Sequence, residues 1–488
     1  MAERGKATGR LLGWLGWAGT DAIGRLLLMT GSTIVFSRLL APREFGIAAL
    51  VLTIVAAAAL FVGSPFEEAL AQRRHVRRQH FRAALGVSWL VAGVIVVLAT
   101  LLGAPLAALY TEPEVGLLLP LAMTSVFFSG HSDILSALAR RLRRFNDIAI
   151  ATLAGHVVGI AAALAMAFAG FGLLALIGQR LFVVVARAII LQWRLGFLIL
   201  PAWAPGHVRS FGRFAGYSFL SRLVENITYL AFTNLVQALY GIAVLGYVNM
   251  AMRLIEPIRG AIVATAHNVA FSFFARAAHD GEKLKRIASE TASQAALAIA
   301  PIFTGLAAVS PVLLPLVAGP GWEDAIGIAV CLSLAAALAV PAGLIYTAFS
   351  ATGRPEYSLY SLVVGFALIS AILVAAKALG PISVGYSRVG GDLVRALFAI
   401  LLSAATLPWT LGARLRTLAP AWLLSGIMGI AVAALGHALA GIAPVARLMI
   451  MISLGILIYA ALLMVFARPF IIGLAARLRG GPHSGTSA

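Results

Sequence analysis

The chain has 488 residues, of which 61% are hydrophobic and 11% are charged, and its formal net charge is +19 at pH 7. Apolar stretches of about 20 residues, the length of a bilayer-spanning helix, follow one another almost from end to end. This composition excludes a water-soluble globular protein, and the short connections exclude a sizeable soluble domain. The single cysteine, Cys331, excludes a disulfide within the chain and a thiolate metal site.

The first apolar stretch follows a basic N-terminus and is longer than the core of a signal peptide. It also contains Asp21 and Arg25, which such a core would avoid, so we expect a retained first span. In chain order, hydropathy and turn residues predict an all-α polytopic protein with about fourteen transmembrane helices, at residues 16–39, 44–64, 84–110, 115–138, 147–169, 171–193, 212–240, 242–272, 289–318, 323–351, 357–379, 382–410, 418–440 and 445–472.

The loops between these spans alternate in charge. Basic residues gather in every second loop, whereas several of the opposite loops are neutral or acidic, as at Glu112 and Glu114. Because basic loops stay on the cytoplasmic side, this pattern predicts that both termini are cytoplasmic and that no span has been missed or invented. The clusters that define the basic side are at residues 4–10, 73–78, 140–144, 194–213, 276–286, 354, 414–416 and 477–479.

Two short sequence echoes indicate an internal repeat. The segment 45–50, at the start of the second span, is similar to 240–245, at the start of the eighth, and Gly170-Phe171-Gly172 has a counterpart in Gly380-Pro381. A six-span unit repeated once, followed by two further spans, gives this pattern. We therefore expect an N-terminal lobe at 1–195, a C-terminal lobe at 209–410, two extra spans at 417–473 and a cytoplasmic tail at 474–488.

Charged residues inside the predicted spans are the strongest functional signal. A charge near the middle of a bilayer is costly, so it normally faces a partner or a wet cavity. Arginines outnumber acids, which favours an anionic ligand because guanidinium binds phosphate with forked geometry. The eight arginines are Arg25, Arg180, Arg187, Arg222, Arg253, Arg259, Arg388 and Arg395, and the five acids are Asp21, Asp133, Glu225, Glu256 and Asp392.

Helical spacing places many of these charges on polar stripes in the first, seventh and eighth spans. The candidate substrate-binding residues are Arg25, Arg222, Arg253 and Arg259, with supporting or coupling roles for Asp21, Glu225, Glu256, Asn226 and Asn249. A second group in the twelfth span is Arg388, Asp392 and Arg395. Several of these residues are three or four positions from an opposite charge, so the alternative interpretation is a set of structural ion pairs.

Four short motifs carry a resemblance to a known family. The segment 36–46 (FSRLLAPREFG) resembles the first periplasmic turn of bacterial polysaccharide exporters, with Ala41 where glycine is common. The segments 70–74 (LAQRR), 211–215 (FGRFA) and 353–355 (GRP) resemble the same family at the second span, the seventh span and the turn after the tenth. The chain is thus similar to the polysaccharide transporter family of the multidrug/oligosaccharidyl-lipid/polysaccharide (MOP) flippase superfamily.

The resemblance implies two six-helix lobes in a V around a central cavity, plus two C-terminal helices. It implies a flippase of the bacterial inner membrane that moves undecaprenyl-pyrophosphate-linked oligosaccharide by alternating access, for lipopolysaccharide or exopolysaccharide biosynthesis. Relatives that flip lipid-linked peptidoglycan precursor place arginines of the first and eighth spans in the cavity, and the resemblance makes Arg25 and either Arg253 or Arg259 the candidates by position here. Membrane lipids, a glycan polymerase and glycosyltransferases are the expected partners, with no nucleic acid.

Neither a cofactor nor a metal site is expected, although transport coupled to a proton or sodium gradient fits the family. Two other functions stay open. A multidrug or cation antiporter of the same superfamily would need an acid-dominated cavity, against which the arginine excess argues. A membrane glycan polymerase would usually need a larger external loop than any predicted here.

Overall fold

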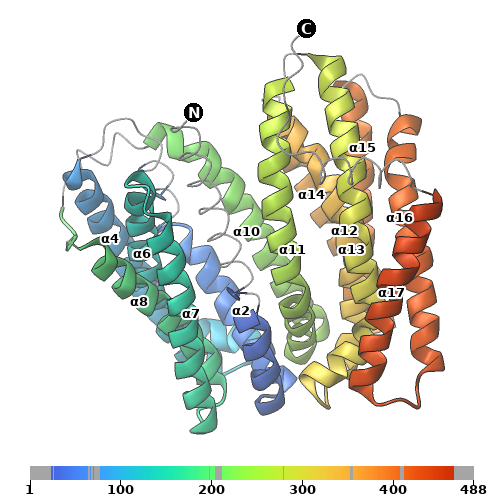
Figure 1. Cartoon of the computed structure of the whole chain (residues 1–488). Coiled ribbons are helices and arrows are strands. Elements are labelled where there is room, and N and C mark those ends of the chain that lie inside the picture. Colours follow the sequence, from blue (N-terminus) through green and yellow to red (C-terminus); the bar gives the residue numbers. More distant parts are fainter. Residues whose placement is uncertain are drawn as a thin grey trace. The chain divides into compact units, whose positions relative to one another are not determined.

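The computed structural model describes residues 24–25, 27–63, 66–67, 70, 77–196, 198–203, 212–277, 280–351, 356–406 and 411–466. Side chains at 212–222, 264–265, 267–269, 271–273, 275–276, 281–283, 285, 350–351, 400, 403–406 and 411–417 lie outside this description. All regular structure in these ranges is helical, with no β-strand (Figure 1).

The first helix, Leu27–Leu39, is preceded by helical residues at Gly24 and Arg25. The other elements are α2 (Pro42–Ala59), α4 (Arg78–Tyr110), α5 (Glu114–Met123), α6 (Ser125–Arg141), α7 (Phe145–Phe168), α8 (Leu173–Leu195), α10 (Gly212–Tyr240), α11 (Ile242–Ala277), α12 (Gly281–Ala318), α13 (Glu323–Ala351), α14 (Glu356–Ala375), the 3₁₀ turn η2 (Lys377–Leu379), α15 (Ile382–Thr406), α16 (Leu411–Ala438) and α17 (Pro444–Phe466).

These helices correspond to the predicted spans in order. Within the described residues, ten of the spans are long and apolar enough to cross a membrane by length and composition alone. The first helix, α10, α11 and α15 complete the series, and they carry most of the intramembrane charges singled out above. One predicted span is broken: the helix expected at 115–138 is divided at Thr124 into α5 and α6, shortly after Pro120, which interrupts the backbone hydrogen bonds of α5.

The chain forms two compact units. Unit 1 comprises residues 1–257 and Ala318–Trp322, and unit 2 comprises Ile258–Val317 and residues from Glu323 onward. The division falls inside α11 at Pro257, which has no N–H to donate to the carbonyl of Arg253. The predicted repeat, with lobes at 1–195 and 209–410, stays a prediction.

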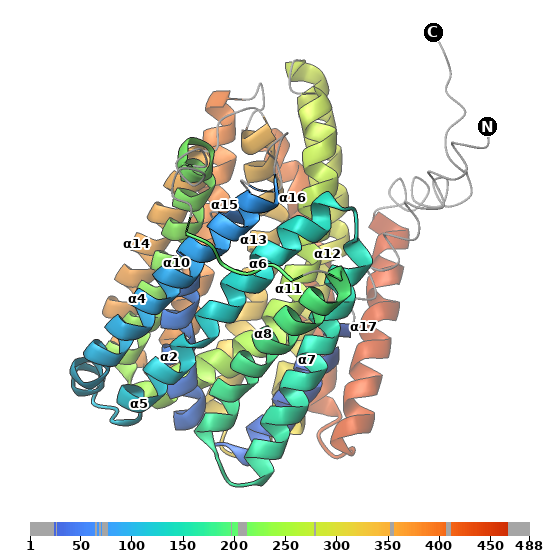
Figure 2. The same ribbon diagram turned by 90° about the vertical axis from the view of Figure 1, so that its left-hand side faces the viewer.

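In unit 1, α4, α6, α8 and α7 lie side by side (Figure 2). Two glycines of α7 explain why α8 packs closely against it: a Cβ on Gly155 would press on the backbone of Arg187, and one on Gly159 would overlap Val183. Phe81, Leu135 and Leu191 belong to the apolar core between these helices.

Ion pairs join the basic helix ends of unit 1. Asp147 accepts hydrogen bonds from Arg194 at 2.6 Å and pairs with Arg144 at 2.5 Å, while Glu67 pairs with Arg140 at 2.5 Å. These ion pairs join helix ends that adjoin three of the predicted cytoplasmic loops, so those loops lie at one end of unit 1. Glu67 therefore takes part in an ion pair at this end of the unit.

The helices α2 and α11 cross at their N-terminal ends with their backbones in contact. A Cβ on Gly46 would overlap the carbonyl oxygen of Ile242, and a Cβ on Gly246 would overlap that of Pro42. The buried Trp322 supports this crossing, because its Nε1 donates a hydrogen bond to the carbonyl of Ser37 at 3.0 Å and its ring packs edge-on against Phe45. The crossing fixes the position of the first turns of α11.

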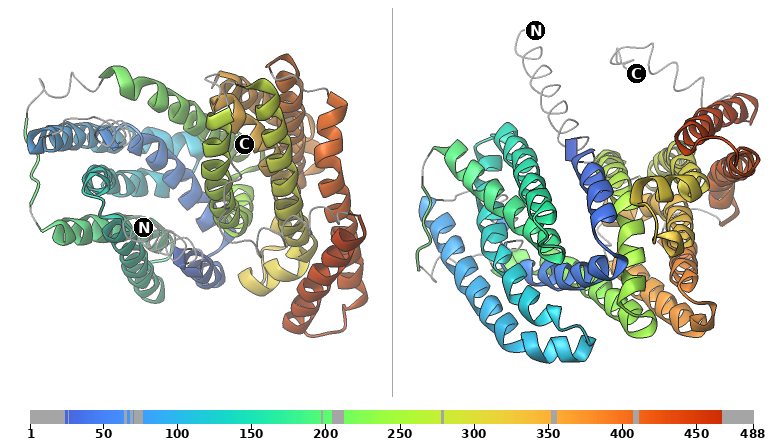
Figure 3. Two further views of the ribbon diagram at one scale, coloured as in Figure 1. Left: turned by 45° about the horizontal axis from the view of Figure 1, so that its top comes forward. Right: turned by 90° about the horizontal axis from the view of Figure 1, so that it is seen from below.

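In unit 2, α16 and α17 run alongside each other, as the orange-red and red ribbons of Figure 3 show. They pack on α12 and α13 through buried apolar residues and two hydrogen bonds to helix carbonyls. The Tyr459 hydroxyl donates to Leu297 at 2.6 Å, and Trp422 Nε1 donates to Ala337 at 3.2 Å. The two extra C-terminal spans are thus part of the fold of unit 2.

Candidate functional site

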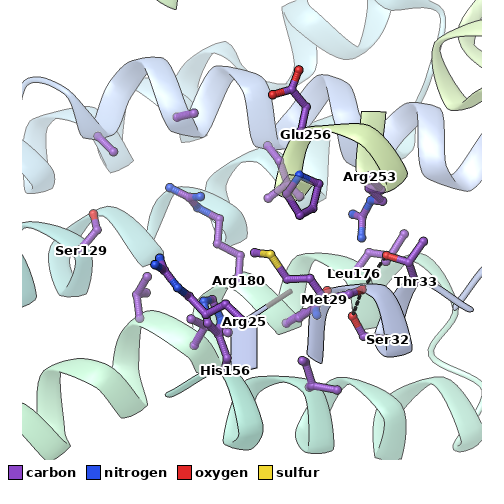
Figure 4. Close-up of a pocket in the computed structure, with 18 of the residues that line it drawn as sticks. Arg25, Met29, Ser32, Thr33, Ser129, His156, Leu176, Arg180, Arg253 and Glu256 are labelled. Atoms are coloured by element: carbon purple, nitrogen blue, oxygen red, sulfur yellow. Dashed lines mark hydrogen bonds between the residues drawn. The ribbon is translucent and has the colours of Figure 1, made fainter. Parts of the chain in front are cut away.

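Unit 1 contains a pocket of about 820 Å³ (Figure 4). Its wall comes from the first helix, α2, α6, α7, α8, α10 and the N-terminal half of α11. Most of these helices are strongly apolar, so the polar residues that line the pocket are exceptions within their own spans. In such a pocket, charged side chains within the membrane can contact a ligand.

Positive charge dominates the lining. Four arginines face two acids and one histidine: Arg25, Arg180, Arg187 and Arg253 against Asp133 and Glu256, with His156. The serine and threonine hydroxyl groups of the lining donate to carbonyls of their own helices. Ser32 and Thr33, for example, both donate to the carbonyl of Met29, at 2.9 and 2.8 Å (dashed in Figure 4). The guanidinium groups therefore set the chemistry of the pocket.

Arg253 is held by neutral partners. Its Nε donates to Asn249 Oδ1 at 3.0 Å, one turn earlier on α11, and its guanidinium lies 5.3 Å from the centre of the Phe45 ring. Among the described residues no carboxylate pairs with it, including Glu256 three positions on. The amide and the ring orient Arg253 and leave its positive charge for a ligand.

Arg187, near the C-terminal end of α8, is paired. Its Nη1 lies 3.5 Å from Asp133 Oδ1, and its Nη2 donates to Ser136 Oγ at 2.9 Å. Asp133 also lies against Gly63, where a Cβ would overlap the carboxylate. This contact network ties α6 to α8.

Arg180 lies two turns before Arg187 on the same face of α8. Its buried Nε has no hydrogen-bond partner, and in the described part of the chain the side chain forms no ion pair. Figure 4 shows its guanidinium on the same side of the pocket as that of Arg25, which reaches in from the first helix above His156. Arg253 lies across the pocket from both.

The structure brings four of the nine predicted site residues of the first, seventh and eighth spans to this pocket: Arg25, Arg253, Glu256 and Asn249. The α10 residues Glu225 and Asn226 do not line it, although Tyr229 of the same helix does. Arg259 belongs to unit 2. Asp21 lies outside the described residues, and so does the side chain of Arg222.

The twelfth-span group forms an ion cluster within unit 2. Asp392, only 5% exposed, lies 3.5 Å from Arg395 and 3.9 Å from Arg388. Arg395 packs its aliphatic part onto Gly365 of α14, and its carbonyl accepts a hydrogen bond from the Tyr346 hydroxyl of α13 at 2.6 Å. The ion pairs themselves lie within α15, and Arg395 links this helix to α13 and α14.

Arg180, Arg187 and Asp133 were predicted to be intramembrane charges but not site residues, and His156 was not among the predicted site residues. A usable signal was present in α8, because Arg180 and Arg187 are seven residues apart and therefore share one face. The distance along the chain between α8 and the first helix concealed their convergence. No group of three His, Cys, Asp or Glu residues that could hold a metal ion occurs in the described ranges.

Comparison with known proteins identifies the family. Residues 35–327 match the model of the polysaccharide biosynthesis protein family. This range includes every residue that lines the pocket except those of the first helix before residue 35. This chain belongs to that family. A curated relative of this polysaccharide biosynthesis protein is the succinoglycan biosynthesis transport protein ExoT of Rhizobium meliloti (strain 1021), 25% identical over 408 residues, which are 80% of this chain and 78% of the relative.

Two solved structures are similar to this chain in fold. The lipid II flippase MurJ in an inward closed conformation matches with a TM-score of 0.75 at 14% identity, over 94% of this chain and 100% of that one. An inward-facing multidrug resistance MATE family transporter of the MOP superfamily matches with a TM-score of 0.59 at 17% identity, over 81% and 96%. These similarities confirm the predicted all-helical, multi-pass membrane fold and its likeness to the MOP superfamily.

Proposed function

We propose that this protein is a flippase that moves a lipid-linked oligosaccharide, attached through a pyrophosphate to undecaprenol, across the bacterial inner membrane by alternating access. The single observation that carries the proposal is the arginine-rich pocket within the membrane-spanning part of unit 1. The name of the succinoglycan transport relative and the likeness to a lipid II flippase support the same substrate class.

The chemistry of the pocket suits a diphosphate. Arg253, held by Asn249 and the Phe45 ring rather than by a carboxylate, keeps its forked donors for phosphate oxygens. Arg25 enters from the opposite wall and supplies the second guanidinium. Hydrogen bonds to charged groups contribute about 1.5–3 kcal/mol each, so two arginines are enough to select a diphosphate over a neutral headgroup.

The proposal also includes the energy source for transport, the topology of the chain and its partners. Glu256 lines the same pocket, and with Asp21 and Glu225 it is a candidate for coupling transport to a proton or sodium gradient. Arg222 and Arg259 stay candidates for substrate binding, and Asn226 stays a candidate for a supporting role. Both termini are cytoplasmic, and the partners are the glycosyltransferases that build the oligosaccharide and the polymerase that receives it. The protein moves its substrate without breaking a covalent bond.

The rival proposal, export of cationic drugs, has the fold similarity to a MATE transporter in its favour. The pocket argues against it, because four arginines outnumber two acids and one of these acids, Asp133, is paired with Arg187. A cationic substrate would face net repulsion at this site.

The test is translocation by the purified protein in proteoliposomes. Three probes separate the alternatives: a fluorescent polyprenyl-diphosphate oligosaccharide, the same oligosaccharide on a neutral polyprenyl ether, and a cationic dye. We expect the diphosphate probe alone to be moved. Movement of the dye without the diphosphate probe would establish the antiporter, and polymerised product in the liposomes would establish an enzyme.

A further inference from the structure

The two arginines of α8 that reach the pocket differ in one respect that points to a ligand. Arg187 has a carboxylate and a hydroxyl as partners, whereas Arg180 has neither. Both sit on one helix, on one face and in one pocket, so their surroundings differ mainly in what each guanidinium contacts. Arg187 therefore serves as an internal reference for Arg180.

An unpartnered guanidinium is costly at this position. The Nε atoms of Arg180 and Arg187 are both removed from solvent without a hydrogen-bond acceptor, but only Arg187 has partners at its Nη atoms, and the acid that it pairs with is Asp133. Burying a charged donor without an acceptor destabilises a protein, and an arginine inside a membrane span adds to that cost. Within the described residues, no hydrogen bond or ion pair of the Arg180 side chain offsets this cost.

The groups that surround Arg180 reinforce this conclusion. Arg25 of the first helix points its guanidinium to the same side of the pocket, with His156 of α7 beneath it and Ser129 of α6 nearby (Figure 4). The Ser129 hydroxyl donates to the carbonyl of Val126 at 3.0 Å, so its hydrogen is committed. Two guanidinium groups on one side of a pocket both attract an oxyanion that enters between them.

We propose that Arg180 binds an oxyanion of the transported substrate jointly with Arg25, at a place in the pocket separate from Arg253. In Figure 4 the Met29 side chain lies between this pair and Arg253. The inference rests on the proposed function and deepens it: the pocket offers two cationic places, and the substrate fills both. The oxyanion is either a phosphate of the diphosphate or a carboxylate of an acidic sugar, and the two share the same bidentate geometry with arginine.

Binding to purified protein in nanodiscs tests the site without relying on transport. The probes are inorganic pyrophosphate and a glucuronate-containing oligosaccharide, each titrated by calorimetry. We expect Arg180→Gln and Arg25→Gln each to weaken binding of at least one probe about tenfold, the effect of one lost charge-assisted hydrogen bond. Arg180→Lys retains the charge but loses the fork, and its affinity should fall between those of Arg180→Gln and the wild type.

Thermal unfolding of the same samples separates a ligand-binding arginine from a structural one. Because Arg180 has no partner, Arg180→Gln should leave the unfolding temperature of the ligand-free protein unchanged or raise it. The matched variant Arg187→Gln leaves Asp133 without its cation and should lower that temperature. Weakened pyrophosphate binding assigns the oxyanion to phosphate, and weakened binding of the acidic sugar alone assigns it to a carboxylate.

Two results would overturn the inference. One is wild-type affinity of Arg180→Gln for both probes. The other is a fall in its unfolding temperature as large as that of Arg187→Gln, which would make Arg180 a structural residue. If the wild type moves no lipid-linked oligosaccharide but Arg180→Gln still weakens anion binding, the flippase proposal fails while the anion site stands.

Discussion

The same spacing of opposite charges has different outcomes in the two units. In unit 2, Asp392 lies within 4 Å of both Arg388 and Arg395, which are four residues before it and three after it. In unit 1, Arg253 and Glu256 are also three residues apart on one helix, yet Arg253 bonds to Asn249 instead. Spacing therefore permits an ion pair without requiring one, and the neighbouring helices decide whether the arginine is neutralised or kept for a ligand.

The largest expected effect concerns the two pocket arginines of unit 1. Substituting both Arg25 and Arg253 by Gln removes two charge-assisted contacts to the diphosphate, each worth about 1.5–3 kcal/mol, so translocation of the labelled probe should fall at least ~100-fold. The measurement is the initial rate in proteoliposomes at matched protein content. The control is Arg82→Gln, an exposed arginine of α4 that bonds to the carbonyl of Leu200 outside the pocket. Equal rates for the double variant and the wild type would refute the site.

The ion cluster of unit 2 should respond in stability rather than in transport specificity. The substitution Asp392→Asn leaves two half-buried cations, Arg388 and Arg395, without their acid, and we expect a loss of about 1–3 kcal/mol in the free energy of unfolding. Detergent-solubilised protein unfolded by heat reports the change. The neutral triple variant Arg388→Gln, Asp392→Asn, Arg395→Gln should recover much of the loss. If it does not recover, the cluster contributes more than charge balance.

The crossing of α2 and α11 offers a further test of the difference between the two units, because in unit 1 it positions Arg253 without an ion pair. The substitution Gly46→Ala places a methyl group on the carbonyl of Ile242, which should cost about 1–3 kcal/mol and weaken diphosphate binding as α11 moves. Gly31→Ala is the matched control, since a Cβ there meets nothing within 4 Å. Thermal unfolding and pyrophosphate titration give the two readouts. A variant as stable as the Gly31→Ala control would show that the helices do not cross so closely.

The smallest effect is expected at Trp322, which packs against the ring beneath Arg253. Trp322→Phe keeps an aromatic ring against Phe45 but removes the hydrogen bond to the carbonyl of Ser37, a loss of about 1 kcal/mol. The unfolding temperature should fall slightly and the affinity for pyrophosphate should change less than twofold. A larger change in affinity than in stability would assign Trp322 a direct part in positioning Arg253.

Much of the fold followed from the sequence because a membrane span is a local property. A run of about 20 apolar residues is read without knowing its neighbours, and the predicted spans and the observed helices agree in order. The break at Thr124 escaped prediction because α5 and α6 form one continuous apolar run, in which Pro120 was compatible with a kinked helix.

The site was predictable only in part. Arg25 and Arg253 were found because the cost of a mid-membrane charge is visible in the sequence, and their excess over acids indicated an anion. Arg180 and Arg187 carried the same signal, but their different partners depend on α6, which lies more than 40 residues away along the chain.

The sequence by itself determined that this is a multi-pass helical membrane protein with a surplus of intramembrane arginines, because hydropathy and charge act through composition and local spacing. Only the tertiary structure decided which arginines are neutralised and which face the pocket. The reason is physical: an ion pair needs its two groups within about 4 Å, and the packing of helices from distant parts of the chain sets that distance.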